Sequence, residues 1–289
     1  MGSIRCQPKK LRKFMGDRVL ASKAARRGFK AEDRIIAAIN NNDEVGKKII
    51  KAIKDLTGYS LISCSAFKCP PRAKADVGIT CNGRQILISV KEFDVDIGFD
   101  YNHVERKYVD FYAQKWSIPK DVYIALKKFV GEVNARGDPI SIEELKRDAE
   151  LLGMSPGKLS KKRRIFLHQM NDQTIENVKR FFSENKMKIL KDIFIDDEAI
   201  EFFIIVKRQR GLAYYYVLPT KDVLDIYSEG DVRITPKGSL LIGRVELQRK
   251  SGDHWTSRGW VDTSASQLQF KIKPSECTIN RSPIVYEKV

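Results

Sequence analysis

Apolar residues recur at the spacing of one helix face in two stretches near the N-terminus. Residues 21–41 predict an amphipathic helix, and residues 44–56 predict a second helix that Thr57 and Gly58 end. Glu32 lies on the apolar stripe of the first helix, where a charged residue is unusual. We therefore take Glu32 as a candidate functional residue, although a capped or solvent-reaching helix residue would produce the same pattern.

Alternating apolar residues predict strands after these helices. Residues 59–67 have a strand-like apolar pattern, and residues 75–81 and 84–93 predict two further strands on either side of Asn82 and Gly83. An Asn-Gly pair between alternating apolar residues is a strong signal for a two-residue hairpin turn. We therefore expect an antiparallel hairpin here.

The remainder of the chain is predicted to be helical first and then mostly β. Helical patterns are found at residues 102–116, 120–130, 141–152 and 174–185. Strands are expected at residues 202–207, 213–218, 232–235, 239–248 and 268–272. The order predicts an α/β protein divided into a basic N-terminal arm (1–20), an α/β region (21–160) and a β-rich region (161–289), which together form one continuous fold.

The charge balance favours a polyanionic partner. Lys and Arg number 53 against 37 acidic residues, which gives a net charge of +16 over 289 residues. Nucleic acid is the common partner of such a chain, because its phosphates release counterions when they are neutralised. An anionic membrane is the competing partner. No apolar run reaches the roughly 18–20 residues of a spanning helix, so we expect no membrane association.

The cysteines predict a reducing compartment. Their number is odd and their spacing fits neither a zinc site nor a disulfide framework, at Cys6, Cys64, Cys69, Cys81 and Cys277. The N-terminus is basic but has no apolar segment of a secretory signal. We therefore expect free thiols and a cytoplasmic protein.

The predicted hairpin brings three polar residues together. A two-residue turn pairs Cys81 with Arg84, so that Asp76 lies opposite Ser89 on one face of the sheet. Lys91 points to the same face, two residues further on. Cross-strand neighbours have Cβ atoms roughly 4.5–5.5 Å apart. A simple cross-strand ion pair between the acid and the lysine remains an alternative explanation.

Asp76, Ser89 and Lys91 resemble the active site of the PD-(D/E)XK nucleases, in which an acid and an acid-X-Lys on adjacent strands hold Mg²⁺ and a water. A metal stabilises charge on the phosphate and acidifies the water, and a nearby ammonium assists. Asp76 and the Val90 carbonyl are natural oxygen ligands for Mg²⁺. Ser89 stands where that superfamily has an acid, so a second carboxylate is expected from elsewhere. Glu32 is the first candidate and Glu105 the second, although Glu105 also fits a solvated face.

Longer segments extend the resemblance over most of the chain. They are SKAARRGFKAEDRI, KADVG, ISVKEF, YNHVERKYVDFYAQKW, ALKKFVGE and the stretch from KKRRIFL to LQFKIKP. These segments resemble type II restriction endonucleases that cut GCGC and are typified by HinP-one-I, a group related to MspI. The resemblance implies a central mixed β-sheet flanked by helices, with a β-rich C-terminal half, and Mg²⁺-dependent hydrolysis of double-stranded DNA at a short GC-rich palindrome. Asp76 and Lys91 match the acid and lysine of the group, and Glu32 matches its helix glutamate.

Candidate DNA-reading residues are concentrated in the C-terminal part. Arg and Lys donate to guanine in the major groove, whereas Asp and Gln accept from cytosine. The candidates of these types are Lys237, Arg244, Gln248, Arg249, Lys250, Asp253 and Arg258. Tyr101, beside Asn102 and His103, could wedge between base steps. Phosphate contacts or solvated charges would account for the first group, and core packing would account for Tyr101.

Two rival functions remain open at this point. One is a structure-specific or repair nuclease of the same superfamily, and the other is a non-catalytic DNA-binding protein, for which Ser89 is the supporting feature. A restriction enzyme would have a DNA methyltransferase as its functional partner, and a homodimer is left open.

Overall fold

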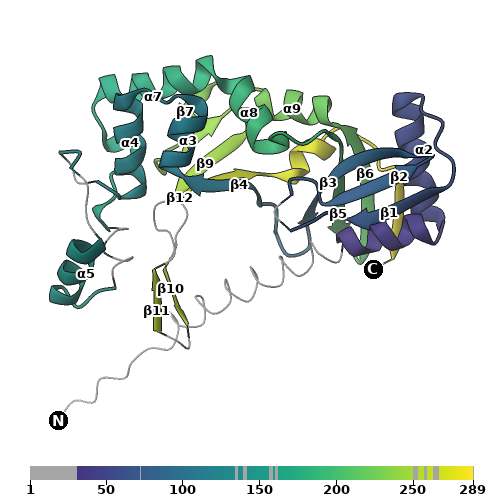
Figure 1. The fold of residues 1–289 in the computed structure, drawn as a ribbon, viewed down its shortest axis with the longest axis horizontal. Coiled ribbons are helices and arrows are strands. Elements are labelled where there is room, and N and C mark those ends of the chain that lie inside the picture. The colour runs from purple at the N-terminus through teal and green to yellow at the C-terminus, as the bar shows by residue number, and fades with distance from the viewer. Residues whose placement is uncertain are drawn as a thin grey trace, which may run out of the picture. The chain divides into compact units, whose positions relative to one another are not determined.

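The computed structural model describes residues 31–71, 73–133, 136–138, 142–155, 159, 162–249, 253–256, 259–262 and 267–288. The basic arm predicted over residues 1–20 lies outside them. The described chain forms two compact units (Figure 1). The first unit draws on Met1–Asp100, Glu198–Thr220 and Lys273–Val289, and the second on Tyr101–Asp197 and Lys221–Ile272. Each unit therefore combines segments that are far apart in the sequence.

The first unit is built on a six-stranded mixed sheet. Its strands follow the order β1 (Cys64–Lys68), β2 (Val77–Cys81), β3 (Arg84–Asp94), β5 (Ile200–Gln209), β6 (Leu212–Pro219) and β13 (Val285–Lys288). β3 and β5 are parallel, and the other neighbours are antiparallel. The helix over residues 31–40 and α2 (Glu44–Thr57) bury their apolar sides against one face of this sheet, where Ile35 and Ile49 join Ile88 and Ile204 in the core (Figure 1). The short helix η2 (Pro274–Thr278) also belongs to this unit.

The hairpin predicted at Asn82 and Gly83 is confirmed. Both residues have positive φ, 50° and 78°, as a two-residue turn matched to the twist of the strands requires. Cys81 pairs with Arg84, and the pairing continues outward to Val77 and Ile88. The register that places Asp76 opposite Ser89 is therefore the observed one.

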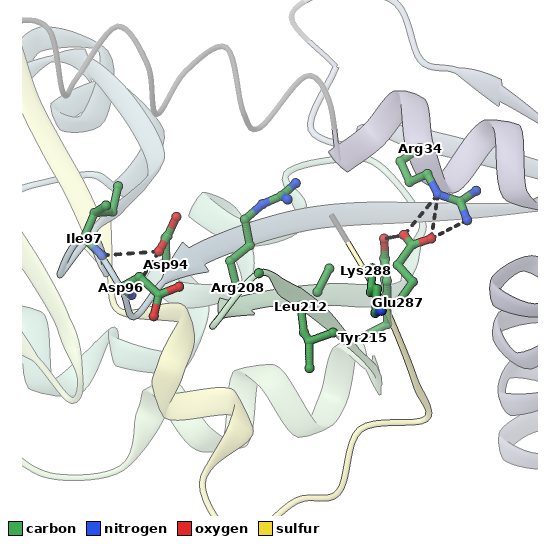
Figure 2. Close-up of a pocket in the computed structure, with 11 residues that line it drawn as sticks. Arg34, Asp94, Asp96, Ile97, Arg208, Leu212, Tyr215, Glu287 and Lys288 are labelled. Carbon is green, nitrogen blue, oxygen red and sulfur yellow. Dashed lines mark hydrogen bonds and ion pairs between the residues drawn. The ribbon is translucent and has the colours of Figure 1, made fainter.

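Partly exposed charged side chains connect the C-terminal strand to the helix over residues 31–40. Arg34 Nε donates to both carboxylate oxygens of Glu287 on β13 at 3.0 Å, and the Tyr215 hydroxyl also donates to Glu287 (Figure 2). Arg34 Nη1 donates to Asp43 at 2.7 Å, and Asp43 caps α2 by accepting from the Gly46 N–H. Two carboxylates and one guanidinium thus join the two helices to the far edge of the sheet beside a pocket of about 590 Å³.

The second unit has a five-stranded sheet with helices on one face. The strand order is β4 (Asn102–Tyr108), β12 (Gln267–Ile272), β9 (Val245–Arg249), β8 (Leu240–Ile242) and β7 (Val232–Ile234). A separate hairpin joins β10 (Asp253–Thr256) and β11 (Gly259–Asp262). The helices are α3 (Val109–Trp116), α4 (Lys120–Val130), α5 (Ile142–Leu151), η1 (Leu167–Gln169), α7 (Asp172–Glu184), α8 (Lys186–Ile195) and α9 (Thr220–Ser228). The rings of Tyr112 and Trp116 on α3 pack against Phe270 of β12.

The expected α/β class is confirmed at the level of mixed sheets with flanking helices. No helix in the described parts of the chain combines the length and the apolar character needed to cross a membrane.

Three expected elements differ from those observed. The single strand predicted over residues 239–248 is a hairpin of β8 and β9. The helix predicted over residues 102–116 begins only at Val109, because residues 102–108 form β4 and pair with β12. Pairing with a strand more than 150 residues away outweighs a short helical pattern, as tertiary contacts commonly do. The strand predicted over residues 59–67 likewise begins only at Cys64.

The expectation of free thiols throughout is wrong for two cysteines. Cys64 and Cys81 form a disulfide, because the antiparallel pairing of β1 with β2 places them directly opposite each other. Their Cα atoms are 4.2 Å apart, within reach of a disulfide. The cysteine spacing alone carries no sign of this pairing, since it depends on a register that only the folded sheet defines. Cys69 keeps its thiol.

Candidate active site

Asp76, Ser89 and Lys91 form one hydrogen-bonded cluster. Asp76 Oδ2 accepts from the Ser89 hydroxyl at 3.0 Å and lies 3.2 Å from Lys91 Nζ. Lys91 Nζ also donates to Ser89 Oγ at 2.7 Å and to the Val90 carbonyl at 3.0 Å. The expectation that turn geometry brings these three residues together is confirmed, and their chemical roles remain proposals.

The backbone of the hairpin holds Asp76 in place. The Asp76 N–H donates to the Ile88 carbonyl at 2.9 Å, and the Val90 N–H donates to Asp76 Oδ2 at 2.6 Å. The side chains of Lys91 and Asp76 are 13% and 25% exposed, so the ammonium is largely withdrawn from water while the acid remains accessible. An ion pair in this setting acts more strongly on a bound anion than an exposed pair does.

Glu32 lies close to this cluster. Its side chain is 14% exposed, and Lys68 Nζ lies 3.1 Å from its carboxylate. Burial raises the pKa of Glu32 above its ordinary value, the Lys68 bond lowers it, and the negative charge of Asp76 raises it further. The carboxylates of Glu32 and Asp76 are thus near enough to interact electrostatically.

The donor set at this cluster fits a hard divalent cation. The described residues include no group of three or more His, Cys, Asp or Glu that could hold a metal. The Asp76 and Glu32 carboxylates together with the Val90 carbonyl instead offer oxygen ligands of the kind that Mg²⁺ prefers. Burial first and the charge of Asp76 second raise the pKa of Glu32, and a cation held by these carboxylates would offset both effects.

Glu105 belongs to the other compact unit. It lies on β4, paired with Phe270 of β12, and its carboxylate accepts from the N–H of Arg106. Glu105 and Asp76 therefore lie on different units, and the metal role expected for Glu105 stays a prediction.

The candidate DNA-reading residues also lie on the second unit. Tyr101 is 44% exposed and its hydroxyl donates to Glu246 at 3.4 Å, so the expected alternative of a packed core ring does not describe it. Asn102 and His103 follow on β4, and Gln248 lies on β9. Lys237 is exposed in the turn between β7 and β8, and Arg244 forms an ion pair with Glu229.

Arg249 is placed differently from expectation. It is 7% exposed, and its Nε donates to the Val130 carbonyl at 2.7 Å. This buried position argues against the DNA contact expected for Arg249, because its guanidinium holds the end of α4. Lys250 and Arg258 lie outside the described residues, as does the side chain of Asp253 on β10.

Glu198 is a residue that the sequence did not single out. Its Oε1 accepts from the Lys74 N–H at 2.7 Å, and its Oε2 accepts from the Ala75 N–H at 2.8 Å. Glu198 thus holds the two residues that immediately precede Asp76. Lys74 and Glu198 are 124 positions apart in the sequence, and no local sequence pattern indicates that they are in contact.

If the site holds the expected Mg²⁺ and cleaves DNA, replacing Glu198 with glutamine should lower cleavage about 10- to 100-fold and raise the Mg²⁺ concentration needed for half-maximal activity, as loss of an orienting partner does at metal sites. The new amide nitrogen cannot accept from an N–H, so one of the two bonds is lost. Cleavage rates across a Mg²⁺ titration measure the effect. Glu201→Gln is the matched control, because Glu201 pairs with Arg84 three residues further along. Equal Mg²⁺ requirements for the two variants would contradict the positioning role.

One family model matches the chain. It is described as R.HinP1I restriction endonuclease and covers residues 81–278. That range holds Ser89, Lys91 and the whole described second unit, whereas Asp76 and Glu32 precede it. No curated protein matches the chain. Because the match covers more than half of the 289 residues, the chain belongs to the R.HinP1I restriction endonuclease family, whose members are DNA-cleaving enzymes.

Proposed function

We propose that this protein is a type II restriction endonuclease that hydrolyses double-stranded DNA at a short GC-rich palindrome with Mg²⁺, through a site of the PD-(D/E)XK type. The observation that supports this most directly is the Asp76, Ser89 and Lys91 cluster in a chain of this family. The net charge of +16 suits a DNA substrate.

Asp76, Glu32 and the Val90 carbonyl would hold the metal. Bound Mg²⁺ would supply stabilisation of the developing phosphate charge and a more acidic water. Lys91 holds its ammonium toward the same region through Asp76 and Ser89, where it can stabilise a phosphate oxygen or orient the attacking water. Ser89 replaces the usual acid and acts as a hydrogen-bond bridge between Asp76 and Lys91.

The DNA is read by the second unit in this proposal. Lys237, Arg244 and Gln248 contact the duplex, and Tyr101 with Asn102 and His103 acts at a base step. A DNA methyltransferase would protect the host's own copies of the target sequence. Both enzymes would then act on DNA in the cytoplasm, where the genome lies. The exposed ring of Tyr101 is the feature that supports a wedge.

Digestion of unmodified plasmid DNA tests the function. With Mg²⁺ we expect discrete fragments with identical sequenced ends, and with EDTA or with Asp76→Asn we expect intact plasmid. Asp55→Asn, on the exposed side of α2, should cut like the wild type. Discrete bands that persist in EDTA would contradict the metal-dependent proposal.

A non-catalytic DNA-binding protein is the second candidate, and Ser89 in the place of an acid is the observation that favours it. It predicts tight binding and no cutting with Mg²⁺, Mn²⁺ or Ca²⁺. A structure-specific nuclease would instead give ends scattered over many sequences.

A further inference from the structure

The five-stranded sheet of the second unit has two chemically different faces. On the helix-covered face, β12 and β9 carry the buried apolar side chains of Leu268, Phe270, Ile272, Val245 and Leu247. Side chains alternate along a strand, so the residues between these point to the opposite face. On β4, β12 and β9, most side chains of that opposite face are polar.

The polar side chains form two rows across the strands. In the first row, Gln269 of β12 lies between Arg106 of β4 and Gln248 of β9. In the second row, Lys271 lies between His103 and Glu246. Directly paired residues share a face of the sheet, so these six side chains form one surface, which we call the polar sheet face.

Contacts within the polar sheet face fix some of its groups. Gln269 is 5% exposed, and its Nε2 lies 2.8 Å from Nε2 of His103. An amide NH₂ only donates, so in this orientation the imidazole nitrogen accepts. The diagonal contact joins the two rows and orients the exposed His103 ring.

Lys271 is held in the middle of the second row. Its Nζ lies 6.0 Å from the Tyr101 ring centroid, and burial lowers the pKa of its ammonium while Glu246 acts in the opposite direction. A fixed hydrogen-bond acceptor stabilises a partly buried ammonium of this kind more than it stabilises an exposed one.

We propose that the polar sheet face reads base edges in the major groove of the DNA target, with Gln248 and Lys271 as base-contacting residues and Gln269 as the positioning residue for His103. This inference rests on the proposed sequence-specific cleavage and names residues that set its specificity. Arg106 and Lys271 accompany a single acid, Glu246, on this surface, so the surface suits a polyanion. Carboxamides carry both donors and acceptors, and a lysine donates to guanine O6 and N7, which is the chemistry of direct readout.

Selection of bound sequences from a random duplex library tests this in the full-length protein without divalent metal, where cutting does not interfere. We expect Gln248→Ala to reduce the preference for the favoured base by about 10-fold or more at one or two positions, as loss of a base contact does. Lys271→Met should do the same at a different position, whereas Lys271→Arg should keep a preference for guanine. Gln85→Ala, on an exposed site of β3, is the matched control and should leave the preferences unchanged.

The outcomes separate this inference from the proposed function. A wild type that enriches no sequence would overturn sequence-specific recognition itself. The wild type could instead enrich one target that Gln248→Ala and Lys271→Met enrich to the same degree. This result would overturn the role of the polar sheet face and leave sequence-specific recognition standing. Uniformly weaker binding with unchanged preferences would also overturn that role, because that result identifies phosphate contacts. Thermal melting of each variant verifies that it is folded.

Discussion

Lys91→Met should lower the rate of Mg²⁺-dependent DNA cleavage about 10²- to 10³-fold, as removal of one preorganised charge-stabilising group does in other enzymes. The ammonium lies 3.2 Å from Asp76 Oδ2 and 2.7 Å from Ser89 Oγ, and it is 13% exposed. Methionine keeps the length of the side chain and removes the charge. Single-turnover cleavage of a duplex containing the target measures the loss without interference from product release.

The same variant separates catalysis from simple ion pairing. If Lys91 only paired with Asp76 across the hairpin, its loss would cost roughly 3 kcal/mol of stability, because the pair is largely withdrawn from water, and would leave cleavage within a few-fold of wild type. Lys54→Met, at an exposed position in the last turn of α2, controls for the loss of one positive charge from a DNA-binding protein. DNA affinity without metal should be similar for the two variants. A catalytic role would be contradicted if Lys91→Met bound DNA much more weakly than Lys54→Met but cleaved the bound DNA at an unchanged rate.

The cluster could be predicted from sequence because its geometry is local. The turn at Asn82 and Gly83 fixes the register, and side-chain alternation then fixes which residues share a face with Asp76. Thirteen positions separate Asp76 from Ser89, and every step between them is a hairpin pair or a turn residue. Glu32 was found for a different reason, since a carboxylate on an apolar helix stripe conflicts with its surroundings.

Features that depend on distant pairing could not be predicted. The Cys64 and Cys81 disulfide requires the β1 and β2 register, and Glu198 reaches Lys74 across 124 positions. Residues 102–108 were expected to be helical because their partner β12 begins only at Gln267. Arg249 looked like a DNA-contacting residue because a count of charges does not show that its side chain is buried against α4.

The family match and the site geometry support different parts of the proposal. The match begins at Cys81 and covers Lys91 and the polar sheet face, but neither Asp76 nor Glu32. The assignment of the acids therefore depends on the hydrogen bonds to Asp76 and on the charge that Glu32 feels from it. Variants of Asp76 and Glu32 consequently test the geometry, whereas variants on β12 test what the second unit contributes.

Gly46→Ala should destabilise the protein by about 3 kcal/mol, as overpacking of a tight contact does. A Cβ at Gly46 would lie 2.2 Å from the Ala38 carbonyl oxygen and 2.8 Å from the Ile39 Cα. Both are backbone atoms of the helix over residues 31–40, so α2 would have to move away from that helix. Alanine is favoured over glycine inside a helix by about 1 kcal/mol. A net loss in the free energy of unfolding therefore has to come from the close contact. Urea unfolding followed by circular dichroism measures it.

Gly58→Ala provides the comparison at the other end of α2. Its Cβ would meet open space, but its φ of +73° would cost alanine roughly 1–2 kcal/mol. The variant at Gly46 should therefore be the less stable, and equal stabilities would show that the helices do not approach so closely. Gly46→Ala should also reduce cleavage in the folded protein, because the two helices must move apart and the helix over residues 31–40 carries Glu32, whereas Gly58→Ala should leave cleavage unchanged. A Gly46→Ala enzyme that is destabilised but fully active would exclude a role for the position of Glu32 in the reaction.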